Sequence, residues 1–170
     1  MAQLEAWLRG PIEGVPPYLM PVAHALVQAA ADVEEAASGL SVEQLWARPG
    51  GAAAVGFHLR HIPGVVERLL TYARGEALSP EQLAAVRREG EPGEPPETAE
   101  ELLAKLREGI DRAMVQIRAT PTEALLERRE VGRKRIPSNV LGLLFHAAEH
   151  AQRHTGQTVA TAKVVRGEPV

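Results

Sequence analysis

Apolar residues recur at three- and four-residue steps over four long stretches of the sequence, and this spacing constrains the fold more than any other feature. The stretches run from Tyr18 to about Ala37, from about Val55 to Arg74, from Thr98 to Ala119, and from Val140 to about Val164. Such spacing places the apolar side chains on one face of a helix. Strand signals are few, so the sequence predicts an all-α fold, an up-down four-helix bundle with crossover loops. The length of 170 residues suits a single domain over residues 1–170.

Capping signals add two short helices to this arrangement. Ser41 begins SVEQLW with a capping-box pattern, and Ser79 begins SPEQ, in which proline takes the first helical position. These signals predict short helices near Ser41–Trp46 and Pro80–Arg88. The stretch REGEPGEPPE that follows is rich in Pro, Gly and Glu, and we expect it to be an exposed, mobile linker. A short strand or ribbon is expected around Leu126–Val131.

Composition excludes several classes of function. Cysteine is absent, which excludes disulfides, thiolate metal sites, iron–sulfur clusters and cysteine nucleophiles. The net charge of -3 gives no general attraction to nucleic acid or membranes. No apolar run approaches the length of a membrane span, and the N-terminus lacks the apolar core of a signal peptide. We therefore expect a cytoplasmic protein with no nucleic-acid or membrane partner, and a homodimer as the commonest oligomeric state.

The chemistry of the chain is concentrated in its histidines. Six occur, all on the predicted long helices: His24, His58, His61, His146, His150 and His154. The last three are four residues apart, so they form one stripe about 80° wide on the final helix. Two histidines at this spacing form a common helical metal clip. No Glu occupies the position that HExxH metalloproteases use as general base, so that class is excluded.

The stripe has two interpretations. A histidine by itself is more often a solvated or hydrogen-bonded side chain than a metal ligand. However, these three lie beside an apolar face, and an unpaired buried imidazole costs about 1–3 kcal/mol. A metal ion would satisfy two or three of them together. The spacing alone leaves both interpretations open.

A second histidine pair lies in GFHLRHIPG, where Pro63 follows His58 and His61. In one interpretation the helix continues through Pro63 and is kinked near His61, because proline cannot donate to the preceding turn. In the other, Pro63 lies in the first helical turn and both histidines precede it in a loop. The regular apolar stripe from Val55 to Leu70 favours the kinked helix.

The two histidine segments together resemble the DinB/YfiT-like family of metal-binding four-helix bundles. HAAEHAQRHTGQ is similar to the family pattern H-x-x-x-H followed by a small residue, Gly and Gln, and GFHLRHI is similar to its upstream histidine motif. The resemblance implies a divalent ion, commonly zinc or nickel, held by His61, His150 and His154. His58, His146 and His24 are additional to the three-histidine pattern and are candidate further ligands, and His146 could replace or join His154.

Three neutral imidazoles leave a divalent ion with an open position, as in catalytic rather than structural zinc sites. The resemblance implies a metal-dependent enzyme, a transferase or isomerase acting with a low-molecular-weight thiol. A metal-dependent hydrolase is a further hypothesis. The alternative is a non-catalytic, metal-binding or stress-related bundle in which the ion is structural. A third hypothesis is a bundle whose histidines bind nothing. Imidazole ligands suit zinc, nickel, copper and iron alike. Manganese is a further candidate, so the sequence does not identify the ion.

Two further features are weaker. The segment ERREVGRKR is basic but has no interleaved aromatic residue for base stacking, so a solvated loop is favoured over a site for an anionic substrate group. Trp46 precedes the histidine pair, and a single Trp more often anchors a loop or core than lines a pocket. Glu149 and Gln157 lie close to the final histidines, but the sequence assigns neither a supporting role.

Overall fold

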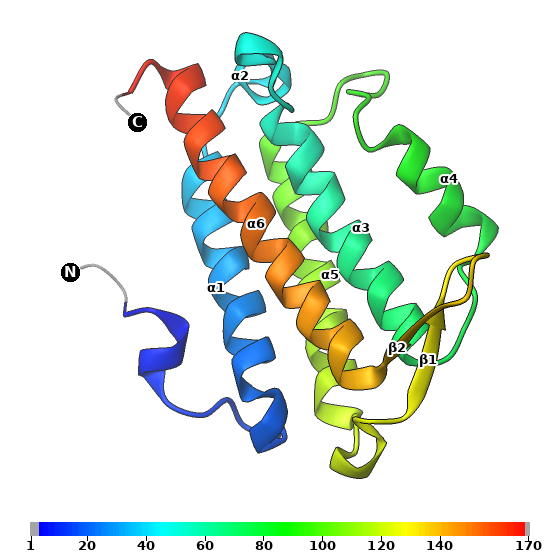
Figure 1. Cartoon of the computed structure of the whole chain (residues 1–170). Coiled ribbons are helices and arrows are strands. Elements are labelled where there is room, and N and C mark those ends of the chain that lie inside the picture. The colour runs from blue at the N-terminus through cyan, green and yellow to red at the C-terminus, as the bar shows by residue number, and fades with distance from the viewer. Residues whose placement is uncertain (1–3, 169–170) are drawn as a thin grey trace.

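The computed structural model describes residues 4–168 and is mostly helical, which confirms the all-α class. The long helices are α1 (Met20–Ala37), α3 (Val55–Ala73), α5 (Ala99–Ala119) and α6 (Val140–Arg166) (Figure 1). The short elements are α2 (Val42–Trp46), α4 (Pro80–Arg88), and the strands β1 (Arg128–Val131) and β2 (Ile136–Asn139). Single turns of 3-10 helix cover Ala6–Arg9, Pro17–Leu19, Pro49–Gly51 and Thr122–Ala124. Within residues 4–168, no helix has both the length and the apolar character needed to cross a membrane.

Side-chain caps define where four of the helices begin. Ser41, Ser79 and Thr98 each form a complete capping box with the residue three positions later, and Ser41 and Ser79 begin the two short helices as the sequence predicts. Asn139 caps α6, since its side chain accepts a hydrogen bond from the Gly142 amide at 2.7 Å. Of the helices that carry histidines, α6 therefore has a side-chain cap, whereas α1 and α3 begin without one.

The four long helices pack in pairs around one core, with α3 and α1 each in contact with both α5 and α6. α6 runs antiparallel to α3, because His61 of α3 lies beside His150 while the earlier His58 lies beside the later His154. α3 and α5 run parallel, because α4 carries the chain back before α5 begins (Figure 1). The alternation of direction therefore holds from α1 to α3 and from α5 to α6, but not from α3 to α5.

Small side chains let these helices approach closely. Ala23 and Ala29 of α1 and Ala147 and Ala151 of α6 are fully buried in the core. Larger aliphatic residues fill the space between the helices: Leu19, Leu26, Leu59, Ile62, Leu70, Leu102, Leu106, Ile117 and Leu144. The core thus consists of Ala and aliphatic residues, in keeping with the low aromatic content of the sequence.

The α3–α5 contact includes one position that only glycine tolerates. A Cβ built on Gly109 of α5 would lie 2.6 Å from Cβ of Pro63, whose ring projects from the middle of α3. Gly156 of α6 is also helical, but a Cβ there would meet nothing within 4 Å. We expect Gly109→Ala to destabilise the protein by about 1–3 kcal/mol through overpacking. The matched variant Gly156→Ala should stabilise it by up to about 1 kcal/mol, because Gly is a poor helix former. Urea unfolding monitored by circular dichroism measures both, and equal effects would contradict this packing.

The hairpin between α5 and α6 is partly predicted. β1 lies within the ribbon expected around Leu126–Val131, and it pairs antiparallel with β2, from Arg128 opposite Asn139 to Val131 opposite Ile136. The sequence gives no sign of β2, because IPSN contains proline and ends in the residue that caps α6. The strand exists through its pairing with β1.

The segment between α4 and α5 is exposed over residues 90–96, as its composition predicts, but it is also tied to α3. Arg60 of α3 donates hydrogen bonds to the main-chain carbonyls of Arg88, Glu91 and Pro92, and also pairs with Glu97. Trp46 donates to the Glu97 carbonyl at 3.0 Å, so it anchors this loop. Glu89, at the start of the segment, is buried, with 6% of its surface exposed. The hydrogen bonds from Arg60 to these main-chain carbonyls thus hold this polar stretch against α3.

Candidate metal centre

Three imidazoles from two helices converge at one point between α3 and α6. Nε2 of His150 lies 3.0 Å from Nε2 of His61 and 3.0 Å from Nε2 of His154. Ligand atoms of these three residues all lie within 4.8 Å of one another. All three side chains are half-buried. The sequence prediction placed these three histidines together, and the structure does bring them together.

The cluster has the donors and the spacing that a divalent ion requires. Bonds of about 2.0–2.1 Å to imidazole place two ligand nitrogens about 2.9 Å apart at a right angle and about 3.3 Å apart at a tetrahedral angle. The observed separations of 3.0 Å fall in this range. Three nitrogens that face one another also need a proton or a cation between them, since their lone pairs repel. The residues present therefore could hold a metal ion.

The geometry follows from local helical structure. α3 continues through Pro63, so His58 and His61 lie inside a helix, and the interpretation that placed them in a preceding loop is wrong. His150 and His154 are one turn apart on α6, which directs both toward the same level of α3. Since α3 and α6 are antiparallel and in contact, one turn of each helix is sufficient to build the cluster.

His58 lies next to the cluster rather than in it. Its Nδ1 lies 3.0 Å from Nδ1 of His154, on the opposite edge of the His154 ring from the shared point. Burial, together with the neighbouring His61, lowers the pKa of both His58 and His154 to about 4. Both rings are therefore neutral at pH 7, the form that binds a metal. One of the two Nδ1 atoms donates and the other accepts, so His58 supports the orientation of His154.

His146 and His24 lie outside the cluster. His146 is exposed and contacts Glu149 at 3.1 Å, although its ring also lies edge-on to that of His150 with centroids 5.4 Å apart. His24 is on α1, where its Nε2 lies 2.9 Å from the Gly10 carbonyl and holds the N-terminal segment. Of the three additional histidines, only His58 is buried beside the cluster.

His61 has a partner that the sequence did not reveal. Its Nδ1 lies 2.7 Å from Oε2 of Glu89, and Oε1 of the same carboxylate accepts from Arg68 at 2.7 Å. Burial of Glu89 opposes its ionisation, but the hydrogen bonds from His61 and Arg68 outweigh burial and hold its pKa below the usual value. Sequence reasoning missed Glu89 because it belongs to the Glu-rich segment after α4, and only the packing of that segment against α3 brings it to His61.

Aromatic contacts restrain the rings further. Phe57 stacks on His61 with centroids 5.0 Å apart and an interplanar angle of 18°, and its edge meets the rings of His58 and His154. Burial also lowers the pKa of His150, whose Nδ1 is buried without a hydrogen-bond partner among the described residues. His61 is thus the most restrained of the three rings, and His150 the least.

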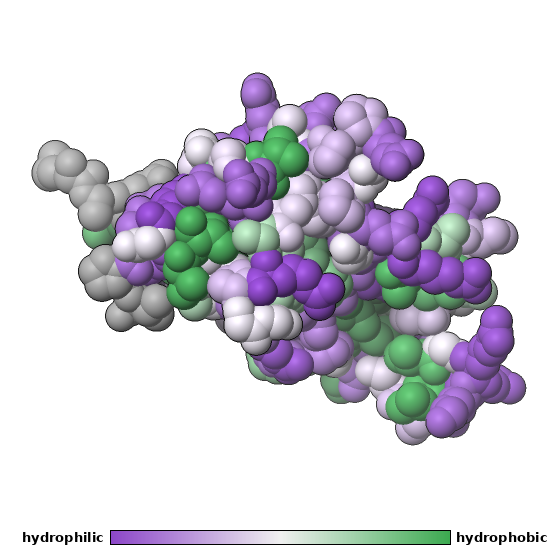
Figure 2. All heavy atoms as spheres, turned by 90° about the horizontal axis from the view of Figure 1, so that it is seen from above, coloured by the Kyte–Doolittle hydropathy of each residue, from purple (hydrophilic) through white to green (hydrophobic). Residues whose placement is uncertain are grey.

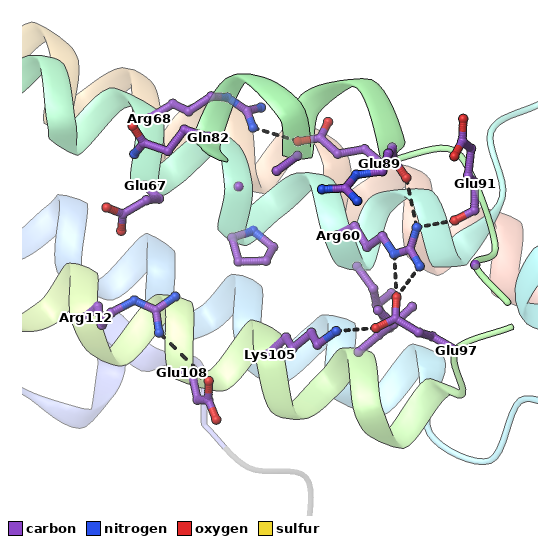
Figure 3. Close-up of a pocket in the computed structure, with 17 residues that line it drawn as sticks. Arg60, Glu67, Arg68, Gln82, Glu89, Glu91, Glu97, Lys105, Glu108 and Arg112 are labelled. Carbon is purple, nitrogen blue, oxygen red and sulfur yellow. Dashed lines mark hydrogen bonds and ion pairs between the residues drawn. The ribbon is translucent and has the colours of Figure 1, made fainter. Parts of the chain in front are cut away.

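A cleft of about 580 Å³ lies beside the histidine cluster, between α3, α4 and α5 (Figure 3). Its floor is apolar, formed by Leu59, Pro63, Ala85 and Leu102, and its rim carries the ion pairs of Arg60, Lys105 and Glu97. No histidine lines it, and Glu89 is the residue that touches both the cleft and the cluster. The cleft and the histidine cluster are therefore separate, and the Glu89 carboxylate lies between them.

The basic segment ERREVGRKR forms the β1–β2 hairpin and has mostly internal partners. Arg128 and Arg135 pair with Glu130, and Arg129 donates to the Ala73 carbonyl at 2.7 Å.

The upper end of the molecule shows mostly hydrophilic residues, with hydrophobic ones in separate patches (Figure 2). Neither surface points to a particular partner.

Comparison with protein families gives a match. The model of the DinB superfamily matches residues 25–158, which include all four long helices in part or whole and every residue of the histidine cluster. A search of curated proteins finds no significant match.

Proposed function

The chain belongs to the DinB superfamily, and we propose that it binds one divalent metal ion through His61, His150 and His154. The observation that carries this proposal is the convergence of three imidazoles from α3 and α6, in which Nε2 of His150 lies 3.0 Å from Nε2 of both His61 and His154. We also infer that α1, α3, α5 and α6 form a four-helix bundle of the superfamily type, in which α4 is the crossover.

The proposed site keeps at least one position open. His58 faces the far edge of His154, and His146 faces Glu149 and solvent. Neither offers a fourth nitrogen at the shared point, and within residues 4–168 the group of potential ligands contains the three histidines alone. Three protein ligands with a free position are typical of catalytic metal sites. This arrangement favours an exchangeable site over a closed structural one.

The bound ion would act as a Lewis acid and would lower the pKa of a bound water or thiol toward neutral pH. The chain's own residues orient the ligand rings and restrict access to the site. His58 holds the His154 ring, Phe57 covers the face of His61, and the half-buried position limits the access of bulk water. We infer a metal-dependent enzyme, a transferase that uses a low-molecular-weight thiol or a hydrolase. Zinc and nickel are the favoured ions because of the family resemblance of the histidine segments, since imidazole ligands by themselves also suit copper and iron.

Metal analysis of protein purified without a metal-affinity tag tests the proposal. We expect elemental analysis, followed by titration of the metal-free protein with zinc, nickel and cobalt, to show one ion bound per chain. A metal-free protein that binds none of these ions would exclude the site. Binding of one ion that exchanges no ligand with azide or thiol would instead support the structural alternative.

A further inference from the structure

We propose that Glu89 is a positioning residue for the metal site, because it fixes which nitrogen of His61 carries the proton. This inference rests on the proposed function, in which His61 binds the ion through Nε2. Arg68 in turn fixes the orientation of Glu89. The three side chains form a line from Arg68 through the carboxylate to the imidazole and on to the histidine cluster.

The hydrogen bonds dictate the proton position. An ionised carboxylate only accepts, so the 2.7 Å contact between Glu89 Oε2 and His61 Nδ1 requires a proton on Nδ1. A neutral imidazole with Nδ1–H has a lone pair on Nε2, the atom that faces His150. A metal ligand must present that lone pair. Glu89 therefore holds His61 in the tautomer that can bind an ion.

The structure makes specific room for this carboxylate. A Cβ built on Gly64 of α3 would lie 2.9 Å from Glu89 Oε1 and 3.0 Å from Arg68 Nη1, so any other residue would displace the pair. No residue of α4 itself is buried, although Glu89 at its C-terminal end is. A buried carboxylate is costly unless it is paired. The contacts with His61 and Arg68 thus compensate the burial of the Glu89 carboxylate.

The main chain around Glu89 is also held in place. Arg60, one residue before His61, binds the carbonyls of Arg88 and Glu91 on either side of Glu89 (Figure 3). The same helix therefore supplies the histidine, the arginine that binds the Glu89 carboxylate, and the arginine that binds its flanking main chain. This arrangement ties the α4–α5 segment to the metal site.

The isosteric variant Glu89→Gln separates a positioning role from a structural one. Arg68 can only donate, so it takes the oxygen of the introduced amide and turns the amide nitrogen toward His61. The nitrogen donates, which makes Nδ1 of His61 the acceptor and moves the proton to Nε2. A positioning role therefore predicts that E89Q damages the site at least as much as E89A does. A purely structural role predicts the reverse, since E89Q preserves size and packing.

Two measurements test this. Nitrogen-15 NMR of the histidine rings in the metal-free protein should show His61 protonated on Nδ1 in the unaltered protein and on Nε2 in E89Q. Competition with a chromophoric chelator should show zinc affinity lowered about 10- to 100-fold in E89Q, the usual effect of losing a ligand's hydrogen-bond partner. Glu91→Gln is the matched control, because its exposed side chain lies two residues away without such a contact, and its zinc affinity should stay within about twofold.

The outcomes distinguish the inference from the proposed function. If the unaltered protein binds zinc and E89Q binds it equally well with the His61 tautomer unchanged, the positioning role is wrong and the metal site stands. If the unaltered protein binds no zinc, the proposed function fails, and the tautomer measurement still decides whether Glu89 controls His61. Circular dichroism confirms that E89Q is folded, and an E89A effect larger than that of E89Q would overturn the inference.

Discussion

Replacing His150 by alanine should reduce bound metal from one ion per chain to nearly none. His150 is central to the cluster, since its Nε2 is 3.0 Å from Nε2 of both His61 and His154. Its removal leaves two imidazoles on different helices, and two ligands hold a divalent ion far less tightly than three. Elemental analysis after gel filtration, with protein concentration from amino-acid analysis, measures the effect.

His24→Ala is the control for this experiment. His24 also lies on a long helix and is also hydrogen-bonded, but its partner is the Gly10 carbonyl and it is absent from the cluster. Its replacement should leave the metal content unchanged. Full metal content in the His150 variant would exclude His150 as a ligand and with it the proposed site.

A small thiol added to the cobalt-substituted protein should bind to the ion as thiolate. The open position expected of a three-histidine site admits the sulfur, and the metal stabilises the ionised thiol. The chain contains no cysteine, so any sulfur-to-cobalt charge-transfer band arises from the added thiol alone. We expect this band in the near ultraviolet to grow with thiol concentration and to saturate.

The histidine variants identify the origin of that band. His61→Ala should abolish it through loss of the ion, whereas His146→Ala should retain it, because His146 faces Glu149 outside the cluster. A cobalt spectrum that ignores thiol would show a closed coordination shell. The catalytic proposal would then give way to the structural one.

The helices and the clustered histidines were predictable because both depend on short-range periodicity. The 3.6-residue spacing, the caps at Ser79 and Thr98, and the four-residue step from His150 to His154 all act within one or two turns. Short-range periodicity could not predict the place of His61 in the cluster, since its contact with α6 depends on two helices meeting in a given register. The resemblance to a known family provided that link, and the structure agrees with it.

The supporting residues could not be predicted because they depend on long-range packing. Glu89 is 28 residues from His61 in sequence and lies in a stretch whose composition indicates a solvated linker. Arg60 ties that stretch to α3 by binding main-chain carbonyls, a contact that side-chain patterns do not encode. β2 was missed for a similar reason, since it is a strand only by virtue of its pairing with β1.

X-ray absorption spectroscopy of the zinc-loaded protein tests the central claim most directly, because it counts the ligands of the ion. We predict three imidazole nitrogens at about 2.0–2.1 Å, with their characteristic outer-shell scattering, and one further light-atom ligand from solvent. In the presence of thiol, that fourth ligand should be replaced by sulfur at about 2.3 Å. Four imidazoles, or a shell of oxygen atoms without imidazole scattering, would contradict an open site built from His61, His150 and His154.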